Sequence, residues 1–169
     1  MEERLVKVGI THGDINGIGY EVILKTLSDT RIAELCTPVI YGSSKIAAYH
    51  RKVLDLPAVN LSIIAQAEDA GANRVNIINC VDDETKVELC QSTTAAGEAA
   101  YLALEAAVTD LKRGAVDVLV TAPINKHNIQ NEQFHFPGHT EYLEQCFGGL
   151  GKNALMILMK DNLRVALVT

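Results

Sequence analysis

Short apolar runs alternate with segments of helical spacing along the chain, and this pattern predicts an α/β fold. In the first run, Leu5–Thr11, the apolar positions are nearly continuous, which is typical of a strand buried on both faces of a parallel sheet. Strands are predicted at Leu5–Thr11, Thr37–Tyr41, Val59–Ala65, Val75–Cys80, Lys86–Leu89, Val116–Thr121, Ala154–Met159 and Leu163–Thr169. Helices are predicted at Gly17–Ser28, from Ser43 or Ser44 to Leu54, from Thr93 or Thr94 to a stop at Gly114, and at His139–Phe147. This order predicts three layers, α/β/α, with a largely parallel sheet covered on both faces.

The chain ends in an apolar run, LRVALVT, with no polar loop or helix after it. A last strand without a neighbour and a covering helix is unusual at the end of a domain. We therefore expect the chain to be a fragment. The alternative is a final central strand in a sheet that is already complete.

The composition is that of a globular protein, since 48% of the 169 residues are hydrophobic and 21% are charged. The formal net charge of −6 argues against a surface for nucleic acid or for anionic membranes. No apolar run has the length of a membrane span, and the start MEERLVKVGI has no signal-peptide core, so a cytoplasmic location is predicted. The cysteines lack CxxC spacing and are expected to be reduced core residues: Cys36, Cys80, Cys90 and Cys146.

The first candidate motif is VGITHGDINGIGYEV, which joins a predicted strand to a predicted helix. Glycines at 13, 17 and 19 permit tight turns and close approach by a ligand, and the helix start offers unpaired N–H groups to an anion. The spacing is neither the dinucleotide fingerprint G-x-G-x-x-G nor a P-loop. A purely structural turn is the alternative, with Asp14 and Asn16 capping the helix and His12 as a surface or turn residue.

The second candidate motif is VTAPINKHNI, at the carboxyl end of a predicted parallel strand, where ligands of open α/β sheets usually bind. There Lys126 is suited to hold a phosphate or carboxylate, and Asn125 to position a hydroxyl. The alternative is a proline-initiated loop with a solvated lysine. His50 and His127 are predicted to lie at the surface.

The third candidate motif is FHFPGHTEYLEQ, in which His139 and Thr140 begin a helix. An imidazole and a hydroxyl at a helix N-terminus are suited to bind an anion. Pro137 and Gly138 rule out a helical zinc pair of His139 with His135, and structural histidines are the alternative. Two other polar stretches are predicted to be structural. The residues Thr93, Thr94 and Gly97 start and pack the long helix, and the run 82–84 is a solvated turn.

The chain resembles the 4-hydroxythreonine-4-phosphate dehydrogenase (PdxA) family in four stretches that occur in the same order: GITHGDINGIGYE, VTAPINK, FPGHTEYL and LRVALVT. The resemblance runs through nearly the whole chain, and its motifs are specific in combination. The opening is also similar to the GDGIGPE start of isocitrate- and isopropylmalate-type dehydrogenases, whose fold the family shares.

This resemblance implies a homodimer whose subunit has two α/β/α domains with the active site in the cleft between them. The domains would correspond here to residues 1–125 and to a truncated second domain, 126–169. The implied reaction is oxidation of 4-phosphooxy-L-threonine by NAD or NADP, assisted by a divalent metal (Zn, Mg or Co). Loss of carbon dioxide then gives 3-amino-2-oxopropyl phosphate, in the synthesis of pyridoxal 5′-phosphate.

The resemblance also implies roles for particular residues. It assigns substrate contacts to His139, Thr140, Asn125 and Lys126, and a place in the cleft-lining loop to Gly13, Asp14, Gly17 and Gly19. The family more often has Met, Pro, Ala and Pro at the positions of His12, Ile15, Asn16 and Tyr20. Its metal ligands lie beyond Thr169, so no metal ligand is expected within this chain, and the 169 residues alone are expected to be inactive.

Three alternatives to this function remain at the level of the sequence. A sister dehydrogenase of 4-phospho-threonate or 4-phospho-erythronate would carry the same motifs. A phosphate acyltransferase with a similar fold would need neither NAD nor metal. A stand-alone binding domain would account for the missing metal ligands.

Overall fold

The computed structural model describes residues 5–149 and 153–168. The chain divides into two compact units, Met1–His135 and Phe136–Thr169. The predicted domain boundary between residues 125 and 126 stays a prediction.

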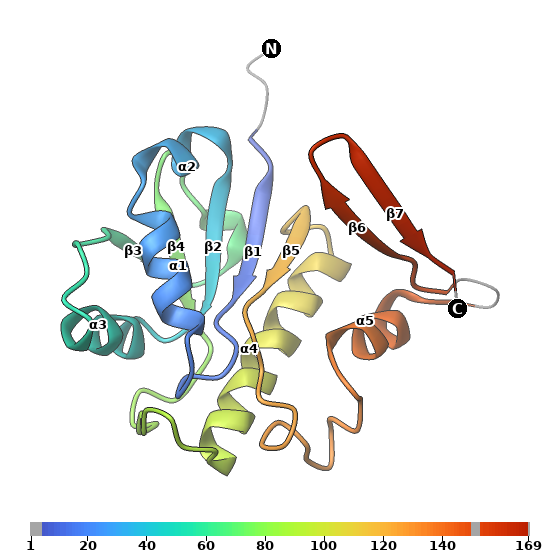
Figure 1. Cartoon of the computed structure of the whole chain (residues 1–169). Helices are drawn as coiled ribbons and strands as arrows, with labels where there is room; N and C mark the ends of the chain where they lie inside the picture. Colours follow the sequence, from blue (N-terminus) through green and yellow to red (C-terminus); the bar gives the residue numbers. More distant parts are fainter. Residues whose placement is uncertain (1–4, 150–152, 169) are drawn as a thin grey trace. The chain divides into compact units, whose positions relative to one another are not determined.

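The first unit is built on a five-stranded parallel sheet with the strand order β3-β4-β2-β1-β5 (Figure 1). Its strands are β1 (Lys7–Thr11), β2 (Thr37–Gly42), β3 (Leu61–Ile64), β4 (Val75–Asn79) and β5 (Val118–Thr121). The central strand β1 pairs with β2 on one side and with β5 on the other. The predicted parallel sheet is therefore confirmed.

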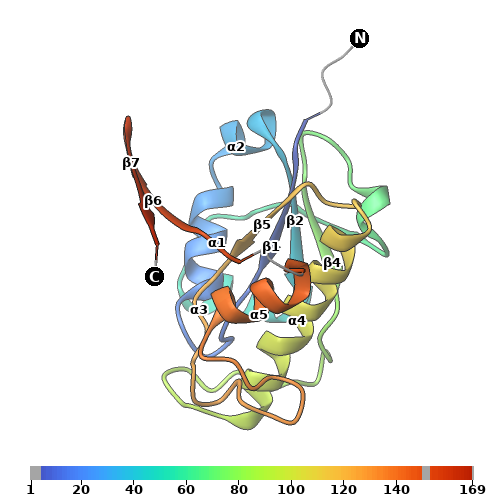
Figure 2. The same ribbon diagram turned by 90° about the vertical axis from the view of Figure 1, so that its right-hand side faces the viewer.

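Helices cover both faces of this sheet, as the order of elements predicts. Figure 2 shows α1 and α3 on one side of the sheet and α4 on the other. The helices are α1 (Gly19–Leu27), α2 (Thr30–Leu35), α3 (Ser44–Val53) and α4 (Thr94–Lys112), and a 3-10 turn, η1, spans Ala67–Asp69. One apolar cluster packs α1 and α3 against the sheet, and a second packs the alanine-rich face of α4 against it. This is the three-layer α/β/α arrangement.

The starts of α3 and α4 and the end of α4 lie where capping chemistry predicts them. The Ser43 side chain accepts a hydrogen bond from the Ile46 N–H at 3.3 Å, and Thr93 does the same for Ala96 at 3.3 Å. After α4, Gly114 has a φ of +74°, the left-handed conformation that commonly ends a helix. Of the predicted alternatives, Ser43 and not Ser44 is the N-cap of α3, and Thr93 and not Thr94 is the N-cap of α4.

The second unit contains the helix α5 (His139–Phe147) and an antiparallel hairpin of β6 (Met156–Lys160) and β7 (Leu163–Leu167). The bounds of α5 are those predicted from the sequence. The hairpin turns at Asp161, whose φ is +51°. The last predicted strand position, Thr169, lies outside the described residues.

Two secondary-structure predictions are wrong. The segment Lys86–Leu89 is not a strand but part of an irregular loop, because the backbone N–H of Glu88 donates to the Asn16 side chain at 2.7 Å instead of to a neighbouring strand. The helix α2 was not predicted. It has six residues and buries none of them, so no apolar spacing marks it, and only the capping bond from the Arg31 N–H to Asp29 at 3.1 Å fixes its start.

Two further observations bear on the predicted environment. Within residues 5–149 and 153–168, no helix is both long and apolar enough to cross a membrane. All four cysteines are free thiols, but Cys90 is exposed, so the prediction of a core position is wrong for it.

Candidate functional site

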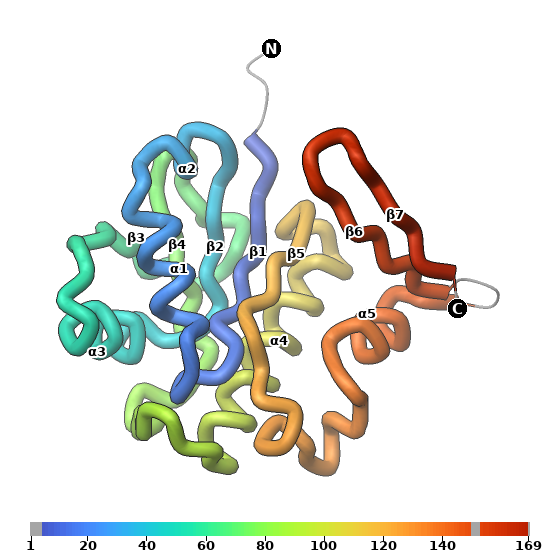
Figure 3. Tube along the Cα trace, in the orientation of Figure 1, coloured from blue at the N-terminus to red at the C-terminus, as the bar shows by residue number. Residues whose placement is uncertain are grey.

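The carboxyl edge of the parallel sheet brings two of the predicted motifs together in the first unit. Thr11 at the end of β1 is paired with Thr121 at the end of β5, so the segments 12–18 and 122–129 leave the sheet side by side (Figure 3). Ligands of open α/β sheets usually bind outside the carboxyl ends of the strands, which is where these two loops lie.

Two glycines of the first loop are required by contacts within the protein. Gly13 has a φ of +69°, and a Cβ there would lie 2.2 Å from the Pro123 carbonyl oxygen. A Cβ on Gly19 would lie 2.0 Å from the His12 carbonyl oxygen. Gly17 is different, because a Cβ there would meet its nearest neighbour, the Asp14 carbonyl oxygen, only at 3.5 Å. Gly13 and Gly19 thus permit close approach between segments of this chain, and Gly17 is exposed.

The carboxylate of Asp14 joins the two loops. It is 8% exposed, accepts a hydrogen bond from the Asn16 N–H at 2.9 Å, and accepts one from the Asn128 side-chain amide at 3.4 Å. The Asp14 N–H donates to the Pro123 carbonyl at 2.9 Å. Asp14 does not cap α1, whose N-cap residue is Ile18 with no side-chain hydrogen bond, so the capping alternative is wrong.

Asn16 ties the same loop to the segment before α4. Its side-chain amide donates to the Gln91 carbonyl at 2.9 Å and to the Thr93 hydroxyl at 3.1 Å. Its side-chain oxygen accepts from the Glu88 N–H at 2.7 Å, and its backbone oxygen accepts from the Cys90 N–H at 3.0 Å. Asn16 is 3% exposed, and these bonds connect the loop to the N-cap of α4.

His12 is fully buried, so the predicted alternative of a surface position is wrong. Its ring stacks on Tyr20, with centroids 5.2 Å apart and planes 10° apart. Burial lowers the pKa of His12 from 6.5 to about 4, and the nearby backbone groups of Gly13 and Ala99 oppose this only in part. Within the described residues neither ring nitrogen makes a hydrogen bond of ordinary geometry. His12 is therefore a neutral core residue at neutral pH.

The second motif is held by its own turn. The Asn125 side chain accepts from the His127 N–H at 3.0 Å and donates to the Ser92 hydroxyl at 3.1 Å. Lys126 is exposed, and so is His127, as predicted. Gly97 of α4 packs against this loop so closely that a Cβ would lie 1.8 Å from the Asn128 carbonyl oxygen. The predicted packing role of Gly97 agrees with this contact.

The third motif lies in the second unit, at the start of α5. His139 is half-buried and Thr140 is exposed. The N-cap position is Gly138, which has no side chain to satisfy the first amides of the helix. Phe136 and Tyr142 make an edge contact with centroids 5.4 Å apart and fix the entry into the helix. The motif therefore combines an imidazole, a hydroxyl and helix N–H groups in one turn.

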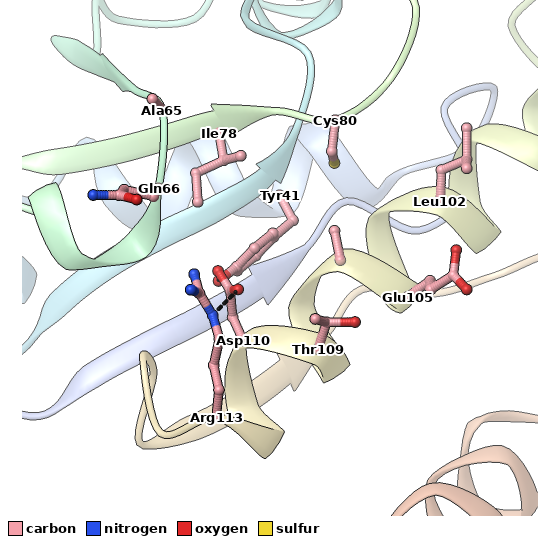
Figure 4. Close-up of a pocket in the computed structure, with 11 residues that line it drawn as sticks. Tyr41, Ala65, Gln66, Ile78, Cys80, Leu102, Glu105, Thr109, Asp110 and Arg113 are labelled. Atoms are coloured by element: carbon pink, nitrogen blue, oxygen red, sulfur yellow. Dashed lines mark hydrogen bonds and ion pairs between the residues drawn. The ribbon is translucent and has the colours of Figure 1, made fainter.

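A cavity of about 400 Å³ lies elsewhere in the first unit, beside α4 (Figure 4). The buried Tyr41 hydroxyl donates to Asp110 at 2.6 Å, and Arg113 bridges Asp110 at 2.8 Å and Glu68 at 3.0 Å. Burial and the Asp110 carboxylate raise the pKa of Tyr41, and burial raises the pKa of the Cys80 thiol to about 12. These groups satisfy one another, and sequence spacing gave no indication of the cluster.

The metal implied by the sequence resemblance finds no ligand set in the part of the chain that the structure describes. No group of three or more His, Cys, Asp or Glu side chains there is arranged to hold a metal ion. The run Asp82–Glu84, predicted to be a solvated turn, is exposed.

Comparisons with known proteins agree with the fold and with the family that the sequence resembles. The family described as "Pyridoxal phosphate biosynthetic protein PdxA" matches residues 34–169. A 4-hydroxythreonine-4-phosphate dehydrogenase of Bacteroides thetaiotaomicron is 60% identical over 100% of this chain and 46% of its own length. A D-threonate 4-phosphate dehydrogenase of Cupriavidus necator is 31% identical over 100% of this chain and 50% of its own.

Solved structures give the same result. The crystal structure of 4-hydroxythreonine-4-phosphate dehydrogenase from Klebsiella pneumoniae is 25% identical, with a TM-score of 0.85 over 98% of this chain and 50% of that one. The enzyme of the same name from Burkholderia phymatum is 28% identical, with a TM-score of 0.83 over 97% of this chain and 49% of that one. This chain spans about half the length of the curated relatives it matches. The match to the family over most of the chain shows that this protein belongs to the PdxA family.

Proposed function

We propose that the protein is a 4-hydroxythreonine-4-phosphate dehydrogenase, which oxidises the hydroxyl of 4-phosphooxy-L-threonine. The observation that carries the proposal is the 60% identity, over the whole of this chain, to the B. thetaiotaomicron protein of that name. The proposed product is 3-amino-2-oxopropyl phosphate, formed after decarboxylation, and the proposed pathway is pyridoxal 5′-phosphate synthesis in the cytoplasm. The proposed assembly is a homodimer.

The proposed hydride acceptor is NAD or NADP, and the proposed assisting ion is a divalent metal such as Zn, Mg or Co. The described residues offer no metal ligand set, so their own proposed part in the reaction is to bind and position the substrate. His139 and Thr140 are proposed to contact the substrate, since the first N–H groups of α5 and the imidazole suit a phosphate or carboxylate. The exposed Lys126 is proposed to supply a further positive charge, with Asn125 beside it.

The loop 13–19 is proposed to line the cleft with backbone groups. Of its predicted ligand residues, Gly17 is exposed, whereas Asp14 is buried and bonded to Asn128 and to the Asn16 N–H. Asp14 is therefore proposed to hold the loop in place and not to contact the substrate.

A second candidate is oxidation of D-threonate 4-phosphate. It is favoured by the 31% identity, again over the whole chain, to the C. necator protein named for that activity. 4-Phosphooxy-L-threonine carries an amine at C2, where D-threonate 4-phosphate carries a hydroxyl. The phosphate is the same in both, so the same phosphate contacts would serve both.

The test is NADH or NADPH formation by the purified full-length protein, with each substrate in turn and with added divalent metal. We expect turnover of 4-phosphooxy-L-threonine, and in Thr140→Val a KM about tenfold higher, the cost of one hydrogen bond to a charged group. Thr30→Val, at an exposed position of α2, is the matched control and is expected to leave KM unchanged. Faster turnover of D-threonate 4-phosphate would establish the second candidate, and no turnover of either would refute both.

A further inference from the structure

His50 lies on α3, far along the chain from the candidate loop, yet it is bonded to that loop. Its Nε2 is 2.8 Å from the carbonyl oxygen of Ile15, and the bond is buried. A carbonyl oxygen only accepts, so Nε2 carries the hydrogen and donates it. His50 is 1% exposed, which makes the prediction of a surface position wrong.

Aromatic contacts fix the orientation of this imidazole. The ring of Tyr20 stacks on it with centroids 5.2 Å apart, and the ring of Tyr49 meets it edge-on at 5.8 Å. Tyr20 is itself held, because its hydroxyl accepts from the Ser43 N–H at 2.9 Å and donates to the Ser43 carbonyl at 3.3 Å. The stacking on Tyr20 therefore aims the donor at Nε2 toward the loop.

The acceptor is equally enclosed. Ile15 is 0% exposed, and its side chain belongs to the apolar cluster under α1 and α3. Water has no access to its carbonyl, so removal of the His50 donor leaves a buried oxygen unsatisfied. The adjacent residues Asp14 and Asn16 carry the bonds that join the loop to its neighbours.

We propose that His50 is a positioning residue for the candidate site, which holds the Ile15 carbonyl and so fixes the loop 13–17 before any ligand binds. The link to catalysis rests on the proposed function, because it requires this loop to line the substrate cleft. The effect of His50 on the loop itself does not rest on the proposed function. His50 acts through the backbone of Ile15, and the loop is preorganised by α3.

The test separates the donor from the ring by a matched pair of variants. His50→Phe keeps a ring against Tyr20 but has no donor, and His50→Gln keeps a donor near the position of Nε2 but has no ring. Tyr49→Leu, which alters packing on the same imidazole without touching the loop, is the control. The readout is amide hydrogen exchange in the full chain at Asp14 and Gly17, whose N–H groups donate to the Pro123 and Asp14 carbonyls at 2.9 and 3.1 Å.

We expect exchange at these two amides to be about tenfold faster in His50→Phe, with β2 amides unchanged, and within about threefold of the parent in His50→Gln and Tyr49→Leu. Unchanged exchange in His50→Phe, or equal acceleration in both His50 variants, would overturn the proposal. A measurement that needs no variant guards against misfolding: ¹⁵N NMR of the parent should show His50 protonated at Nε2. Protonation at Nδ1 alone would also overturn it.

Activity then tests the link to the site. In the full-length protein we expect kcat/KM for 4-phosphooxy-L-threonine to fall about tenfold in His50→Phe and to be largely restored in His50→Gln. An equal loss of kcat/KM in the two variants would show that the hydrogen bond from His50 to Ile15 does not contribute to catalysis. If the parent protein turns over neither substrate, the proposed function fails, while the exchange result still decides what His50 does to the loop.

Discussion

Acidification should destabilise the fold through His12. In the folded chain burial lowers the pKa of this histidine to about 4, whereas in the unfolded chain it returns to 6.5. Between these values the unfolded state binds a proton that the folded state does not, so stability is complete above about pH 6.5 and decreases as the pH falls toward 4. The difference in pKa corresponds to a loss of about 3 kcal/mol from the free energy of unfolding.

Urea denaturation at a series of pH values measures this loss, with His12→Phe as the reference protein. Phenylalanine can stack on Tyr20 as the imidazole does but takes up no proton. The chain has no tryptophan, and four of its five tyrosines lie in the first unit, so tyrosine fluorescence reports mainly on that unit. His50, whose pKa burial also lowers, is present in both proteins, so its own titration contributes to both pH profiles.

We expect the stability of the parent relative to His12→Phe to decrease by about 3 kcal/mol from pH 7 to pH 4. Parallel pH profiles for the two proteins would refute the reasoning, because they would mean that His12 takes up its proton equally well in the folded and unfolded states.

Three further substitutions are expected to change the free energy of unfolding, measured by urea denaturation at pH 7. Gly97→Ala should destabilise by about 2 kcal/mol, because overpacking against the Asn128 carbonyl outweighs the gain in helix propensity; a stabilised variant would contradict this. Asn16→Ala removes three side-chain hydrogen bonds and should cost about 3 kcal/mol, so a loss below about 1 kcal/mol would be inconsistent with the network. Tyr41→Phe leaves Asp110 one donor short and should cost about 1–2 kcal/mol, and an unchanged stability would show that this bond contributes nothing.

Most of the fold could be predicted from the sequence because its boundaries are marked chemically. Ser43, Thr93 and Gly114 carry the capping groups or the conformational freedom that end a helix, and the structure uses each of them in that way. The failures lie where local pattern carries little information. The helix α2 buries no residue, and the apolar character of Lys86–Leu89 reflects Val87 packing on the core from a loop.

The candidate site was predictable in its location and not in its interior. The glycines and polar residues at the carboxyl edge indicated which loops meet there. The hydrogen bonds of Asn16 join it to residues 72 to 77 positions later in the sequence, and no local sequence pattern predicts such a contact. The stacking of Tyr20, contributed by α1, on both His12 and His50 is a contact that no local sequence pattern shows.

Burial bears on the positions at which, according to the resemblance described from the sequence, the first loop is expected to differ from its family. All four are at most 3% exposed: His12, Ile15, Asn16 and Tyr20. Their side chains face the protein, and they determine how the loop is held by α1, α3 and the segment before α4. The exposed part of the segment is Gly17 and Ile18. The departures therefore give no reason to expect a different substrate. Discrimination between 4-phosphooxy-L-threonine and D-threonate 4-phosphate has to come from side chains that reach the ligand.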